Sequence, residues 1–144
     1  MEAINLVAKA EADINVPAYK VWEALTNPEM IKKYMFGTTV VSDWKVGSKI
    51  SWKGEWKGKP YEDKGVILQM KPDKLLQYSH YSPLSGLPDV PENYNTIVTI
   101  ELTPKGNQTF VILLQDNNTT EEARDHSEKN WQMILDGLKK LLEG

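Results

Sequence analysis

Acid–base or metal chemistry in this chain would depend on its two histidines, His80 and His126. His80 alternates with Leu76 and Tyr78 on one face of an expected strand. His126 falls at the edge of the apolar face of an expected final helix. Two histidines without a placed carboxylate make a weak metal site, because such sites normally take three or four ligands. Two roles remain open for His80: an aromatic-like group packed in a cavity wall, or a hydrogen-bond donor or general base facing that cavity.

Other reactive constellations are missing from the sequence. The chain has no cysteine, which excludes disulfides, thiolate catalysis and cysteine metal sites. There is no glycine-rich phosphate loop before a helix and no G-x-S-x-G elbow. Glu121 and Glu122 are better explained by favourable charge at a helix N-terminus than by catalysis. The sequence therefore assigns no catalytic residue, no metal ligand and no cofactor, and favours a protein that is not an enzyme.

Aromatic and polar side chains on expected inner faces are the remaining candidates for function. Each aromatic residue alone is more typical of a core than of a binding site. Together they have the composition of a small-molecule pocket, which is apolar with a few polar anchors. The candidate pocket residues are Tyr34, Trp52, Trp56, Leu68, Tyr78, His80, Ser127, Asn130 and Trp131.

A long amphipathic helix between Thr119 and Leu142 must position the last three of these residues. Thr119 and Glu122 have the spacing of a capping box, which marks the helix start. The apolar stripe consists of Ala123, Trp131, Ile134, Leu135, Leu138, Leu141 and Leu142. Ser127 and Asn130 project on the same side, so this face is partly polar in its first half. Either both bond to water or a neighbouring strand, or the first half of the helix covers a cavity.

The chain before this helix predicts mainly β-strands. Residues 4–14 alternate as a first strand, and two short helices follow near 18–25 and 29–34. In the final helix, Gly137 suggests that the helix backbone approaches the sheet closely. In the strand over 61–70, Val66, Leu68 and Met70 are expected on one face, opposite Ile67 and Gln69. Residues 82–95 form a long irregular stretch that is either a binding loop or a stabilising rim. The other expected strands cover 39–41, 48–56, 75–81, 96–102 and 109–115.

This order predicts an α+β layer fold. A curved antiparallel sheet of about six to seven strands would wrap around the C-terminal helix and leave a cavity between them. The 144 residues are expected to form one domain, 1–144. A net charge of −3 and a pI near 5.4 argue against a nucleic acid or an anionic membrane as partner. Without a signal peptide or a run of about 18 apolar residues, the expected location is the cytoplasm.

Several stretches in this order resemble the START/Bet v 1-like helix-grip superfamily, and more closely its AHSA-like branch. They are Val16 to Ala18 with Val21 to Pro28, Gly47 to Trp52, Gly65 to Pro72, Leu76 to His80, and Trp131 with Leu135 and Leu138. Asn27, Tyr34 and His80 depart from the residues usual there. The resemblance implies a hydrophobic cavity but no single activity, since relatives include lipid binders, cyclase-like enzymes and co-chaperone domains.

Three functions follow as hypotheses. The first is binding of a small hydrophobic or lipid-like molecule in the cavity, without catalysis. The second is a cyclase-like or hydrolase-like enzyme that uses His80 and Tyr78. The third is a protein-interaction module, as a homodimer or a chaperone partner, with an exposed apolar patch around Leu84, Leu87 and Val90.

Overall fold

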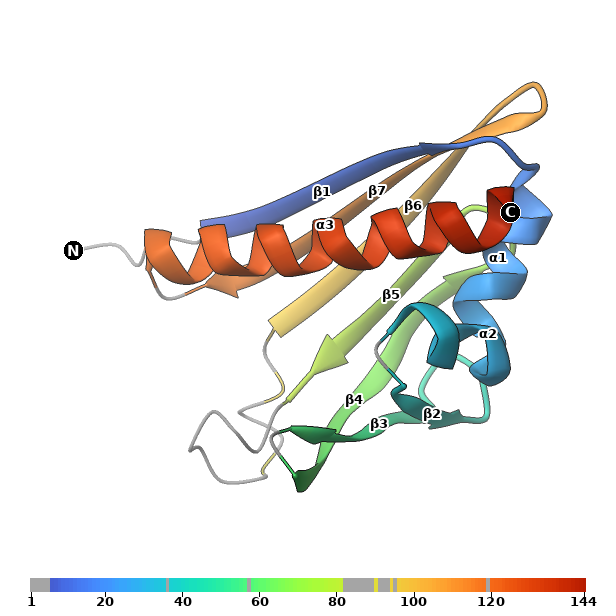
Figure 1. Cartoon of the computed structure of the whole chain (residues 1–144). Coiled ribbons are helices and arrows are strands. Elements are labelled where there is room, and N and C mark those ends of the chain that lie inside the picture. The colour runs from blue at the N-terminus through green and yellow to red at the C-terminus, as the bar shows by residue number, and fades with distance from the viewer. Residues whose placement is uncertain are drawn as a thin grey trace.

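The computed structural model describes residues 6–35, 37–56, 58–81, 90, 94, 96–118 and 120–144, without the side chain of Trp56 (Figure 1). Within them, one antiparallel sheet has the strand order β1-β7-β6-β5-β4-β3-β2, and α3 lies across its concave face. The predicted α+β helix-grip fold is confirmed. The elements are β1 (Leu6–Ile14), α1 (Ala18–Thr26), α2 (Pro28–Tyr34), β2 (Thr39–Ser42), β3 (Lys49–Trp56), β4 (Lys59–Lys71), β5 (Leu75–His80), β6 (Thr96–Lys105), β7 (Gln108–Asn118) and α3 (Glu121–Glu143).

Helix α3 supplies one side of the core. Ile134, Leu135 and Leu138 are buried against the sheet, as the apolar stripe predicts. Thr120 caps the helix, because its side-chain oxygen accepts a hydrogen bond from the Ala123 N–H at 3.0 Å. The cap therefore lies one residue after the predicted one, and Thr119 is outside the described residues.

The two short helices close one end of the space between α3 and the sheet (Figure 1). Asn27 ends α1 and caps α2 by accepting the Glu29 N–H at 2.9 Å, and Pro28 occupies the first turn, where its missing N–H costs nothing. The Tyr34 hydroxyl donates to the carbonyl of Ala24 at 2.8 Å. This bond joins α2 to α1 at the end of the space between α3 and the sheet.

A β-bulge in β4 overturns one prediction about facing. Ile67 pairs with Tyr78, but Gln69 pairs with Gln77, so Leu68 is an extra residue without an opposite partner. Ile67 is fully buried on the concave face, whereas Leu68 is 37% exposed. The expectation that Leu68 shares an inner face with Met70 is therefore wrong, because the bulge shifts the alternation by one residue.

The expected long loop and apolar patch lie mostly outside the described residues. Most of residues 82–95 are not described, including Leu84 and Leu87 of the patch, whereas Val90 is described and is 37% exposed. Among the described residues, no helix is long and apolar enough to cross a membrane.

Candidate functional site

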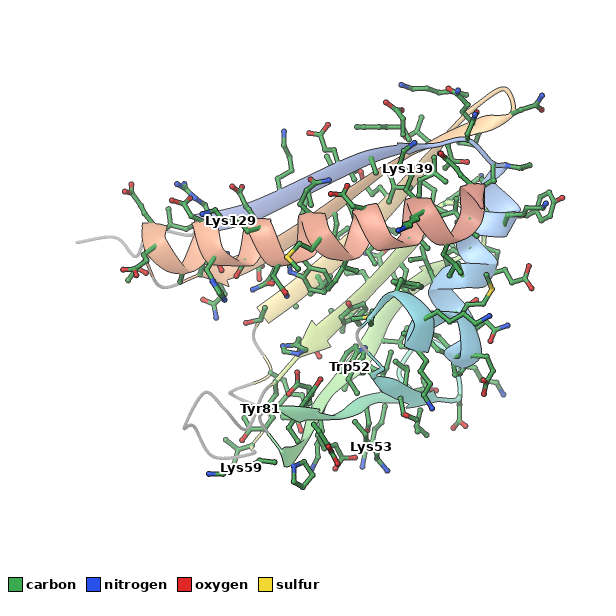
Figure 2. The ribbon with its side chains drawn as sticks, in the orientation of Figure 1. Trp52, Lys53, Lys59, Tyr81, Lys129 and Lys139 are labelled. Atoms are coloured by element: carbon green, nitrogen blue, oxygen red, sulfur yellow. The ribbon has the colours of Figure 1, made fainter. Side chains whose placement is uncertain are left out.

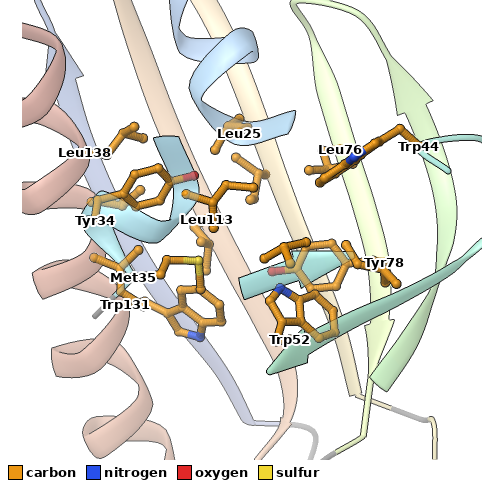
Figure 3. Close-up of a pocket in the computed structure, with 16 residues that line it drawn as sticks. Leu25, Tyr34, Met35, Trp44, Trp52, Leu76, Tyr78, Leu113, Trp131 and Leu138 are labelled. Carbon is orange, nitrogen blue, oxygen red and sulfur yellow. The ribbon is translucent and has the colours of Figure 1, made fainter. Parts of the chain in front are cut away.

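A cavity of about 30 Å³ lies between the concave face of the sheet and α3 (Figure 3). This volume accommodates one or two water molecules, whereas pockets for drug-sized ligands measure about 300–1,000 Å³. Its lining is almost entirely apolar and comes from both short helices, α3 and the strands. The lining residues are Leu25, Ile31, Tyr34, Met35, Val40, Trp44, Ile50, Trp52, Leu76, Tyr78, Ile100, Leu113, Trp131, Ile134, Leu135 and Leu138.

Aromatic rings form much of the cavity wall. The rings of Trp52 and Tyr78 are tilted at 46° with centroids 4.9 Å apart, and Trp131 faces them from α3 (Figure 3). Figure 3 also shows the Tyr78 hydroxyl directed into the cavity. Burial raises the pKa of Tyr78 well above its ordinary value, and burial followed by the proximity of Tyr78 raises the pKa of Tyr34. Both hydroxyls therefore stay protonated at neutral pH, and that of Tyr78 can donate to a bound molecule.

His80 lies beside this aromatic wall but does not line the cavity. Its Nε2 is 3.1 Å from Oδ2 of Asp63, and its ring lies 5.3 Å from that of Trp52. The other carboxylate oxygen, Oδ1, is buried and has no hydrogen-bond partner among the described residues. Such a carboxylate fixes the orientation of an imidazole, as in acid–base pairs.

Sequence reasoning missed Asp63. Its position depends on the register of β4 against β5, where Lys64 bridges to Tyr81 in an antiparallel pair. Only the turn at Pro72 and Asp73 indicated that register, and the bulge at Leu68 shifts it by one residue. The enzyme hypothesis requires His80 and Tyr78 to meet in one open pocket, but only Tyr78 lines the cavity.

The polar residues on the first half of α3 have a structural explanation. The Ser127 hydroxyl donates to Oδ1 of Asn118 on β7 at 3.0 Å, which is the neighbouring-strand alternative. Asn130 is exposed, contrary to its expected inward position. The Trp131 indole N–H donates to Oε1 of Gln115, so this ring lines the cavity while its polar edge is bound to β7.

The predicted pocket residues thus divide into groups. Tyr34, Trp52, Tyr78 and Trp131 meet at the cavity, His80 lies beside its aromatic wall, Ser127 is bonded to β7, and Asn130 is exposed. Leu68 lies on the opposite face of the sheet, and the side chain of Trp56 is outside the described residues. Reasoning from sequence also missed aliphatic wall residues such as Leu113 and Ile100, since their strands signal burial but not a cavity. In the described part of the chain, no group of three or more His, Cys, Asp or Glu side chains is placed to hold a metal ion.

A curved sheet holding one long helix over an apolar cavity defines a helix-grip domain of the START/Bet v 1-like superfamily. Residues 15–143 match the family described as activator of Hsp90 ATPase homolog 1-like protein, and the chain belongs to this family. The predicted AHSA-like membership is confirmed. No curated protein matches the chain.

Solved structures agree with this assignment. ChR145 from Cytophaga hutchinsonii is 62% identical, with a TM-score of 0.85 over 99% of this chain and 97% of the other. Aha1 from Colwellia psychrerythraea, solved as a dimer, is 24% identical, with a TM-score of 0.73 over 97% and 96%. CalU16 from Micromonospora echinospora is 20% identical, with a TM-score of 0.72 over 99% and 87%. The last two are similar in fold alone.

Proposed function

We propose that this protein binds a small apolar molecule between the concave face of the sheet and α3. The observation that carries the proposal is the cavity itself, whose wall combines the aromatic rings of Trp52, Tyr78 and Trp131 with aliphatic side chains. Apolar walls with few polar groups are typical of ligand pockets. A ligand with an apolar body and one hydrogen-bond acceptor would match the chemistry of this wall, since the protonated Tyr78 hydroxyl faces the cavity.

Binding requires the cavity to enlarge, because about 30 Å³ holds no organic ligand. Two wall residues are suited to move. Met35 is only partly buried and has a flexible, unbranched side chain. Trp131 is partly exposed, and its single hydrogen bond to Gln115 is the polar contact that its displacement would break. We therefore expect the ligand to enter between these two side chains and to displace them.

Native mass spectrometry of the protein as purified, compared with its denatured mass, tests the proposal first. Extra mass that is lost on denaturation identifies the size of a bound molecule. A panel of apolar compounds should then raise the melting temperature, since a ligand that binds only the folded state stabilises it.

Cavity variants make this test specific. Trp131→Ala should open the entrance and enlarge the response to aromatic compounds, whereas Met133→Ala, on an exposed side chain of the same helix, should leave it unchanged. Leu113→Trp should fill the space and abolish the response. The proposal fails if no compound stabilises the wild-type protein or Trp131→Ala, or if Leu113→Trp folds and responds like the wild type.

Self-association is a second candidate function. It is supported only by the relative from Colwellia psychrerythraea, whose structure is that of a dimer. Light scattering on the eluting protein tests it directly: a mass of twice 16.4 kDa supports a homodimer, and a mass of 16.4 kDa over a wide concentration range excludes one.

A further inference from the structure

A second and much larger pocket, of about 630 Å³, lies on the convex face of the sheet, away from α3. In β3 the side chain of Trp52 is on the α3 side and that of Lys53 points away from it (Figure 2). Because side chains alternate along a strand, Lys49 and Ser51 share the outward face with Lys53. The described lining residues are Lys49, Ile50, Ser51, Lys64, Gly65, Val66, Leu68, Ser79, Tyr94 and Ile97.

The floor of this pocket is apolar on a face where an antiparallel sheet is normally polar. Val66, Leu68 and Ile97 come from β4 and β6, and Leu68 is 37% exposed. The volume falls within the range of about 300–1,000 Å³ that is usual for small-molecule sites. An apolar floor of this kind suits the hydrocarbon part of a ligand.

The hollow lies where β4 carries its bulge. Val66 and Leu68 flank the buried Ile67 and therefore share the convex face, and the bulge after them returns Met70 to the core. Ser79 fixes this part of β4, since its Oγ accepts the Val66 N–H at 3.0 Å. A Cβ on Gly65 would lie 1.9 Å from the carbonyl oxygen of Ser79, so only glycine allows β4 to approach β5 this closely. Gly65 and Ser79, which both line the hollow, thus fix the close approach of β4 to β5 at this place.

The charge of the lining points to the sign of the ligand. Lys49 is the exposed cation among the described lining residues, and these include no carboxylate. This contrasts with the chain as a whole, which has a net charge of −3. Lys49 is exposed at the rim, where its ammonium group can meet an anionic group at the end of an apolar molecule.

We propose that the convex pocket is a binding site for a small amphipathic anion. The apolar part of this molecule would lie on Val66, Leu68 and Ile97, and its carboxylate or sulfonate group would face Lys49. Apart from Ile50, which lines both, the two sites share no described lining residue, so each can be tested through residues of its own.

Decanoate is a suitable probe, with methyl NMR as the readout. Saturable shifts are expected for the methyl groups of Val66, Leu68 and Ile97, and none for Ile67, Ile100 and Leu113, whose side chains face the interior. Decanol has the same chain length but no charge, and it should bind about tenfold more weakly, because one favourable charge contact near a surface is worth about that factor.

Charge and shape variants complete the test. Lys49→Glu should weaken decanoate binding about tenfold, whereas Lys53→Glu, on the same strand and face but outside the lining, should change it little. Leu68→Trp should block the pocket, and Val41→Trp, at a 53% exposed position, is the matched control for a surface tryptophan.

Three results would overturn the proposal. Shifts confined to interior methyl groups would place decanoate in the cavity and support the proposed function alone. The absence of any saturable shift would mean that the convex pocket holds no such ligand. Equal affinities for decanoate and decanol, or unchanged binding in Lys49→Glu and Leu68→Trp, would exclude an amphipathic anion at this place.

Discussion

Gln132 of α3 makes two hydrogen bonds with the backbone of Glu11 on β1: it accepts the Glu11 N–H at 3.3 Å and donates to the Glu11 carbonyl at 2.9 Å. Strand β1 is an edge of the sheet, so these backbone groups have no partner strand. Other side chains of α3 do the same along β1: Glu128 accepts the Lys9 N–H and Lys139 donates to the Asp13 carbonyl. Glu143 accepts the N–H of Asn15, the residue after β1. The polar flank of α3 thereby takes the place of a further strand and protects the edge from pairing with another chain.

Replacing Gln132 should weaken this protection. Gln132→Ala removes both hydrogen bonds, together with the one that its Nε2 donates to Oδ1 of Asp136 at 3.1 Å, and should lower the free energy of unfolding by about 1 kcal/mol, since the groups are exposed to water. Gln132→Glu keeps an acceptor for the Glu11 N–H but loses the donor and sets a carboxylate beside that of Asp136, so we expect it to recover little of this loss. Urea denaturation measures both, with Met133→Ala as a control on the next residue. Equal stability of Gln132→Ala and the wild type would show that water replaces these bonds without loss.

The Asp63–His80 pair should behave as a coupled unit. His80→Phe keeps an aromatic ring against Trp52 but leaves the partly buried Asp63 carboxylate without its described partner. We expect a loss of about 1–3 kcal/mol in the free energy of unfolding. Asp63→Asn in the His80→Phe background removes the stranded charge and should recover part of that loss, giving a coupling energy of about 1 kcal/mol in a double-mutant cycle. Strictly additive single effects would mean that the two side chains contribute independently.

Helix periodicity predicted which side of α3 faces the sheet. It did not predict how far along α3 the strands reach. Ile134, Leu135 and Leu138 are buried as expected, whereas Asn130, one turn earlier on nearly the same side, is exposed. A periodic pattern defines a direction around the helix axis. The extent of its contact depends on where distant strands end, which the local sequence does not encode.

Strand alternation has the same limit in β4. A period of two residues predicts facing only while the pairing is regular, and the bulge at Leu68 brings Ile67 and Met70, three residues apart, to the same core face. The same shift hid the contact between Asp63 and His80, because that contact depends on the register between two strands. The cavity walls from β6 and β7, such as Ile100 and Leu113, could be predicted as buried but not as members of a site.

Alkaline pH should destabilise the protein through Tyr34 and Tyr78. Burial raises both pKa values above the ordinary value of about 10, so above that pH the unfolded chain releases protons that the folded chain retains. The free energy of unfolding is therefore unaffected by these groups below pH about 10 and falls above it, by about 1.4 kcal/mol per pH unit for each tyrosine.

Denaturation monitored together with phenolate absorbance checks this pH dependence. The two buried tyrosines, Tyr34 and Tyr78, should ionise only as the protein unfolds. Tyr78→Phe should reduce the slope of stability against pH by the share of one tyrosine. Complete ionisation of all tyrosines in a protein that remains folded would contradict the burial of these hydroxyls.

Two glycines should respond in opposite directions to the same substitution. The Cβ of Gly65→Ala would collide with the backbone of Ser79, so this variant should force β4 and β5 apart and unfold at a much lower denaturant concentration. The Cβ of Gly137→Ala would lie 3.6 Å from the Tyr34 Cβ, which is an ordinary contact. Gly137 therefore packs against α2, and not against the sheet as the sequence predicted. Because alanine favours the interior of a helix over glycine, Gly137→Ala should raise the free energy of unfolding by up to about 1 kcal/mol. Parallel denaturation of the two variants measures both effects. Destabilisation by Gly137→Ala would mean that α2 and α3 are packed more tightly than this distance indicates.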